Sequence, residues 1–273
     1  MTRSFHHISC DKDRLAATLD GGTETTALLI VSGGNEIRSG AHGGMARLAA
    51  RIAERGFPVL RYDRRGIGES TGDNSGFLGS AAEIIAATRF LRQQLPQVKS
   101  VIAFGNCDAA TALALFGPSA GLDGYILANP WVIESASATD GEQTPISSAA
   151  IRSRYWDRIK NPKTILDLFS GKIDIGKLLK GLKQASRSDD TGALALRLRD
   201  GLAGLEQDTR LLLAKRDSTA RAFLAAWKSS NFEPLRSKSA IRIETLDSAS
   251  HSFADAASKD WLTAQVLEAL RSS

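Results

Sequence analysis

The 273-residue sequence contains only two cysteines, Cys10 and Cys107, and this scarcity excludes a disulfide framework and favours a reducing, cytoplasmic environment. No apolar run is long enough for a membrane-spanning helix, and the first residues lack the apolar core of a signal peptide. Histidines and cysteines nowhere show the paired spacing of a zinc site, and no glycine-rich loop resembles a Walker motif. We therefore expect no metal, no cofactor and no transmembrane segment.

Aromatic residues are also scarce, at 6% of the chain, and they are not interleaved with basic residues on one face. This excludes the usual pattern of nucleic-acid binding. The net charge of +5 comes from one segment, 152–187, which holds ten lysines and arginines against three aspartates, a local charge of about +7. Such a basic segment could bind an anionic acyl substrate or an acidic carrier protein, or make weak contact with a membrane surface. A solvated surface without a partner is the alternative.

What the sequence does contain is a short motif within residues 101–110, where an apolar run is broken by Gly-Asn-Cys-Asp-Ala and followed by an alanine-rich helical pattern. This order corresponds to the G-x-S-x-G nucleophile elbow of the α/β-hydrolases, with Cys107 in the serine position and Ala109 closing the motif. The flanking residues are small because a strained strand-to-helix turn leaves no room for larger ones. The turn predicts a thiolate at the positive end of the helix. A buried, inert cysteine is the alternative.

An acid and then a histidine must follow the nucleophile along the chain in this fold. Asp217 comes three residues after the short apolar run 211–214, at the carboxyl end of a late predicted strand. His251 is the one histidine after Cys107, and it lies in a loop between the predicted strand 241–246 and the final helix. The sequence therefore predicts a triad of Cys107, His251 and Asp217, with Asp247 as a second candidate for the acid.

Backbone donors for an oxyanion are expected in the loop after an earlier strand. The apolar run 27–31 predicts a central parallel strand, and it ends in Ser-Gly-Gly-Asn at 32–35. The N–H of Gly34 or Asn35, together with the N–H of Asp108 after the nucleophile, would hold the developing oxyanion. The side chain of Asp108 leaves a question open, because a carboxylate beside a thiolate disfavours ionisation of the sulfur unless it points away.

Strand patterns near residues 28, 59, 101, 124, 210 and 241 alternate with helical patterns, which predicts the α/β-hydrolase fold with a mostly parallel, doubly wound sheet. A further strand over 14–19 would pair at the edge of this sheet. The D-x-R-G-x-G-x-S string at 63–70 shapes a loop in such folds, so we expect Asp63, Arg65 and Ser70 to be structural.

The alternation of strands and helices stops after residue 131, and no strand pattern returns until residue 211. Apolar residues within this interval recur with helical spacing. The sequence therefore predicts an inserted helical cap over 131–207, carried by an α/β-hydrolase core made of residues 1–130 and 208–273.

Three segments together resemble the exosortase A system-associated hydrolase 1 family: the Ser-Gly-Gly-Asn string at 32–35, the loop at 62–70 and the cysteine elbow at 105–109. The segment 155–172 also fits that family. The resemblance implies an α/β-hydrolase encoded with bacterial exopolysaccharide and exosortase genes. The site is also similar to that of dienelactone hydrolase, which uses a cysteine nucleophile with aspartate and histidine.

A triad of this kind predicts a hydrolase, an esterase or thioesterase that acts through an acyl-enzyme intermediate. Its substrate would be a small acyl compound, free or linked to a carrier or lipid. Two alternatives have different chemistry: an acyltransferase in envelope polysaccharide assembly, and a non-catalytic binding protein with the same fold.

Overall fold

The computed structural model describes residues 2–133 and 192–273. The strands are β1 (Arg3–Cys10), β2 (Asp13–Asp20), β3 (Thr26–Val31), β4 (Val59–Tyr62), β5 (Ser100–Asn106), β6 (Gly124–Ala128), β7 (Thr209–Ala214) and β8 (Ile241–Leu246). The helices are α1 (Gly44–Ala53), α2 (Ala81–Gln94), α3 (Asp108–Ala120), α7 (Ala193–Gly204), α8 (Ser218–Lys228), α9 (Glu233–Arg236) and α10 (Ala256–Arg271). Short 3₁₀ turns occupy Ala41–Gly43, Phe77–Gly79 and Ser230–Phe232.

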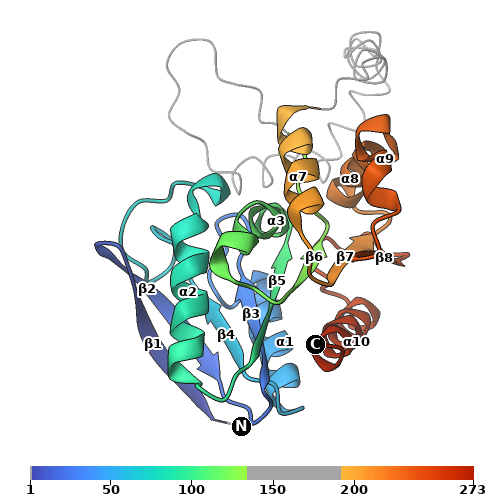
Figure 1. Cartoon of the computed structure of the whole chain (residues 1–273). Coiled ribbons are helices and arrows are strands. Elements are labelled where there is room, and N and C mark those ends of the chain that lie inside the picture. The colour runs from blue at the N-terminus through green and yellow to red at the C-terminus, as the bar shows by residue number, and fades with distance from the viewer. Residues whose placement is uncertain (1, 134–191) are drawn as a thin grey trace, which may run out of the picture. The chain divides into compact units, whose positions relative to one another are not determined.

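All the strands of the described residues join one sheet, in the order β1-β2-β4-β3-β5-β6-β7-β8 (Figure 1). β2 runs antiparallel to its two neighbours, whereas the other six strands, β3 to β8, are parallel to one another. β1 is not one of these six, because it pairs only with β2. This confirms the mostly parallel sheet that the sequence predicts. From β3 the chain moves first to β4 on one side and then to β5 on the other, so the carboxyl ends of β3 and β5 flank a topological switch point.

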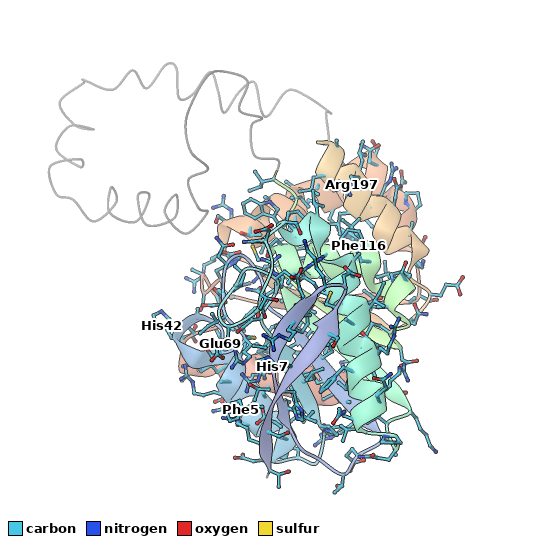
Figure 2. The ribbon with its side chains drawn as sticks, turned by 90° about the vertical axis from the view of Figure 1, so that its left-hand side faces the viewer. Phe5, His7, His42, Glu69, Phe116 and Arg197 are labelled. Atoms are coloured by element: carbon cyan, nitrogen blue, oxygen red, sulfur yellow. The ribbon has the colours of Figure 1, made fainter. Side chains whose placement is uncertain are left out.

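The amino-terminal strands differ from the prediction in one respect. The strand expected over 14–19 is β2, but it lies between β1 and β4 rather than at the edge. The edge is β1, whose Phe5 and His7 lie on this outer strand (Figure 2) and whose Phe5 is 73% exposed. Because most side chains of β1 are polar or exposed, its sequence carries little of the apolar alternation that marks a strand.

Helices cover both faces of the sheet, and the central strands are apolar on both sides for this reason. Alternate side chains of β3 face opposite layers: Leu28 and Ile30 join a core with α1 and α10, whereas Leu29 and Val31 join a larger core with α2, α3, α7 and α8. Every residue of β3 is buried. Double-sided burial explains why a central parallel strand lacks polar alternation.

Most of the cap predicted over 131–207 lies outside the described residues, as does the basic segment 152–187. The last part of that range forms α7, which belongs to the same compact unit as the sheet. Its Leu198 and Leu202 are fully buried. A side chain at Gly201 would come within 2.7 Å of the carbonyl oxygen of Ala114, so the glycine allows α7 to lie close against α3.

The string at 63–70 has the structural role expected of it. The buried carboxylate of Asp63 pairs with the guanidinium of Arg38, and the Ser70 hydroxyl donates to the Asp63 carbonyl oxygen at 2.7 Å. Arg65 forms an ion pair with Glu83, with 3.0 Å between Nε and Oε1. These contacts hold the loop after β4 against the loop after β3 and against helix α2.

Candidate active site

Cys107 lies between the end of β5 and the start of α3, in a backbone conformation that non-glycine residues rarely adopt, with φ 64° and ψ −126°. Its N–H donates to the Ala128 carbonyl oxygen at 2.9 Å, which ties the turn to the end of β6. A side chain at Gly105 would come within 2.7 Å of the backbone of Ala109. The close approach explains why small residues flank the cysteine in the predicted elbow.

Asp217 and His251 meet at the carboxyl ends of the parallel strands. Asp217 follows β7 and begins α8, where its Oδ2 accepts the Ala220 N–H at 3.0 Å as a helix N-cap. The same oxygen lies 3.0 Å from Nδ1 of His251, which comes from the loop after β8. The Asp217 side chain is 6% exposed and that of His251 is 29% exposed.

The second candidate for the acid has another partner. Oδ1 of Asp247 lies 3.1 Å from Nε of Arg216, and its side chain is 76% exposed. Asp217 is thus the carboxylate that contacts the histidine, and Asp247 takes part in a surface ion pair.

His251 is hydrogen-bonded to Asp217, and both Asp217 and Cys107 affect the pKa of its imidazole. Burial lowers the pKa of His251, but hydrogen bonds to Asp217 and Cys107, with the negative charges of both, outweigh burial and raise the pKa to about 10. Burial likewise raises the pKa of Asp217, whereas the hydrogen bond and charge of His251 and two backbone N–H groups bring it below the ordinary value. Both partners therefore favour the protonated form of the imidazole.

The backbone of His251 is held by two asparagines that the sequence analysis did not single out. The side-chain amides of Asn106 and Asn129 each donate to the His251 carbonyl oxygen at 3.1 Å. Asn129, fully buried after β6, also accepts the Ala214 N–H at 2.9 Å through Oδ1. These contacts join the ends of β5, β6 and β7 to the histidine loop. The only signal in the sequence is that each asparagine closely follows an apolar run with a strand pattern.

The loop after β3 contains the predicted oxyanion donors, and one of them is already engaged. The Gly34 N–H donates to Oδ1 of Asp108, with 2.6 Å between nitrogen and oxygen. The Asp108 carboxylate thus points toward this loop. On the other side of Gly34, the buried guanidinium of Arg64 donates to the Gly34 carbonyl oxygen. The Asn35 side chain accepts from Asn74 at 3.0 Å.

Neither a cluster of metal-binding side chains nor a membrane-spanning helix occurs among the described residues. No group of three or more His, Cys, Asp or Glu side chains among them is arranged to hold a metal ion. In the same part of the chain, no helix is long and apolar enough to cross a membrane.

No family model matches this chain, and no curated protein matches it. Solved structures share its fold. The esterase Pf2001 of Pyrococcus furiosus has 15% sequence identity and a TM-score of 0.66, over 99% of this chain and 92% of that one. The dienelactone hydrolase of Anabaena variabilis has 12% identity and a TM-score of 0.61, over 98% and 95%. Est1E of Butyrivibrio proteoclasticus, with ferulic acid bound, has 15% identity and a TM-score of 0.60, over 98% of each chain. The chain has the α/β-hydrolase fold.

The contact between Cys107 and His251 can be tested by titration. Replacing Cys107 by alanine should lower the pKa of His251, because the hydrogen bond and the charge of the sulfur both raise it in the native protein. NMR titration of the imidazole measures the change. Cys10→Ala is the matched control, since Cys10 is a buried free thiol on β1. An unchanged His251 pKa in Cys107→Ala would contradict the contact.

The same shift predicts how stability depends on pH. The pKa of His251 in the folded protein lies above its ordinary value of 6.5, so the histidine stabilises the fold fully below pH 6.5. This contribution is lost as the pH rises from about 6.5 to about 10. Urea unfolding of the native protein and His251→Gln at pH 6 and pH 10 should therefore show a larger loss for the native protein.

Proposed function

We propose that the protein is an acyl-transfer hydrolase that cleaves an ester or thioester, with Cys107 as nucleophile, His251 as acid and base, and Asp217 as the residue that orients the histidine. The observation that carries the proposal is the hydrogen bond of His251 to Asp217, together with the influence of Cys107, at a strained turn between strand and helix, on the pKa of the same imidazole. The three side chains lie far apart in the sequence, and the order Cys, Asp, His along the chain is the one expected for acyl transfer in this fold.

In the first half of the reaction, the Cys107 sulfur attacks the acyl carbon and the carbonyl electrons move onto oxygen. When the tetrahedral intermediate collapses, the bond to the leaving group breaks, and the departing oxygen or sulfur takes the proton from Nε2 of His251. Asp217 keeps Nδ1 of the imidazole engaged, so Nε2 is the nitrogen that faces the reacting atoms.

The second half of the reaction depends on the loss of charge at the sulfur. In the thioester Cys107 carries no charge, so both of its contributions to the raised pKa of His251 disappear. The neutral imidazole then removes a proton from water, which attacks the thioester carbon. The tetrahedral intermediate then collapses, the C–S bond breaks and the acid leaves. The sulfur keeps the electron pair and the imidazole keeps the proton, so the ion pair of cysteine and histidine forms again.

The solved structures with the same fold support an ester-cleaving role, since one is named an esterase and another a dienelactone hydrolase. The resemblance of three segments to the exosortase-associated family suggests that the acyl group belongs to an envelope polysaccharide system. A sugar hydroxyl in place of water would make the same site an acyltransferase. In either case the substrate is a small acyl compound, free or attached to a carrier or lipid, and the basic segment 152–187 would attract an anionic one.

The direct test is covalent labelling. Purified protein is incubated with a short activated ester or a thioester, and intact mass followed by peptide mapping locates the adduct. We expect an acyl group on Cys107, and none on this residue in His251→Ala. Decay of the adduct in water, compared with decay in added alcohols, separates hydrolysis from transfer. Folded protein that forms no adduct with any acyl donor would contradict the proposed function.

A further inference from the structure

The Asp108 carboxylate occupies the backbone donor that an oxyanion would use. Gly34 lies in the loop after β3, where the fold places an oxyanion N–H beside that of the residue after the nucleophile. Oδ1 of Asp108 is 2.6 Å from this nitrogen, the short distance of a charge-assisted hydrogen bond. A side chain at Gly33 would come within 2.8 Å of the same oxygen, so the carboxylate lies against the loop.

A substrate oxygen cannot share this donor with the carboxylate. One N–H directs one strong hydrogen bond, and a negative charge at that place also repels the charge that develops on the acyl oxygen. Either the loop or the Asp108 side chain must therefore move before Gly34 can assist the reaction.

The loop is held more firmly than the side chain. Arg64 holds the carbonyl oxygen of Gly34, and the Gly33 carbonyl oxygen accepts the Glu36 N–H at 3.1 Å across the turn. Gly34 has φ 57°, a conformation in which a glycine is unstrained. Asp108, in contrast, is half-buried in the first turn of α3, where its side chain can rotate.

We propose that Asp108 is a displaceable occupant of the oxyanion site, and that its displacement selects substrates carrying a hydrogen-bond donor, an ammonium or hydroxyl group, next to the acyl carbon. This inference rests on the proposed function. A half-buried carboxylate that leaves Gly34 needs a new partner, since an unpaired buried charge is costly. A donor beside the acyl carbon enters at the same place as the acyl oxygen and supplies that partner. A plain alkanoyl group does not.

The experiment compares two probes with one leaving group, p-nitrophenyl acetate and glycine p-nitrophenyl ester. The rate of acylation of Cys107 is followed by stopped-flow release of p-nitrophenol, with Cys107→Ala as the baseline. In Asp108→Ala the acetyl rate should rise about tenfold, the factor expected when a charge-assisted hydrogen bond no longer competes. The ratio of glycyl to acetyl rates should fall by a similar factor. Asp108→Asn keeps an acceptor for Gly34 without the charge, so its acetyl rate should rise less than that of Asp108→Ala, and its preference for the glycyl ester should also fall.

Asp208→Ala is the matched control, because it removes one carboxylate at the amino end of β7, where Asp208 pairs with Arg210 and Arg242. Both of its rates should equal those of the native protein. Thermal unfolding confirms that each variant is folded.

Two results would overturn the inference. If Asp108→Ala lowers both acylation rates equally, the carboxylate only supports the loop, and if it changes neither rate nor their ratio, the carboxylate does not compete. A different result, no adduct on Cys107 in any folded variant, would overturn the proposed function and this inference with it.

Discussion

Replacing Cys107 by alanine should abolish acyl-enzyme formation and reduce turnover of an ester by about 10³-fold or more, the scale of loss when an enzyme loses its nucleophile. The alanine removes the attacking atom and leaves the rest of the site in place, because a methyl group fits the same strained turn between Gly105 and Ala109. Turnover is measured with an activated ester after subtraction of the uncatalysed rate.

Two further variants sharpen this result. Cys107→Ser should retain a weak but measurable esterase activity, because the hydroxyl can attack once His251 accepts its proton. Cys10→Ala should retain the native rate, because this buried thiol lies on β1, away from the proposed triad. Native activity in Cys107→Ala would rule out the proposed mechanism.

Replacing Asp217 by asparagine should reduce turnover by about 10²-fold or more, because the imidazole loses the charge that stabilises its protonated form and sets its orientation. Asparagine is chosen because it is as good a helix N-cap as aspartate, so α8 keeps its first turn and the loss concerns chemistry rather than folding. The pKa of His251 should fall in the same variant, which NMR titration reports independently of activity.

Asp247→Asn is the matched control, since Asp247 is the other acid near His251 in the sequence. Its exposed ion pair with Arg216 contributes little, so turnover should stay within about twofold of the native protein. A large loss in Asp247→Asn combined with native activity in Asp217→Asn would reverse the assignment of the acid.

Much of the fold follows from local patterns along the chain. β3 and β7 are buried on both faces, so their sequences are short apolar runs bounded by polar loops, and such runs are recognisable without a structure. β1 is different, because it pairs with one neighbour at the edge and exposes most of its side chains. Its position is decided by its pairing with β2. No local pattern of apolar residues in the sequence indicates this pairing.

The candidate site divides in a similar way. Parallel strands have their carboxyl ends on the same side of the sheet. Residues that closely follow a strand in the sequence, such as Asp217, can therefore be placed on that side without a structure. The sequence also indicates the turn at Cys107 through the small residues on either side. It does not indicate that Asn129 holds the His251 carbonyl oxygen, because that hydrogen bond joins elements 122 residues apart.

The sequence by itself determined the alternation of strands and helices, the cysteine at the elbow, and the one histidine that follows it. The tertiary structure decided which acid contacts that histidine, and it turned the Asp108 carboxylate onto the Gly34 N–H. The physical reason is range: periodicity and turn chemistry act over a few neighbouring residues, whereas the partner of a side chain depends on which loops the folded sheet brings within hydrogen-bonding distance.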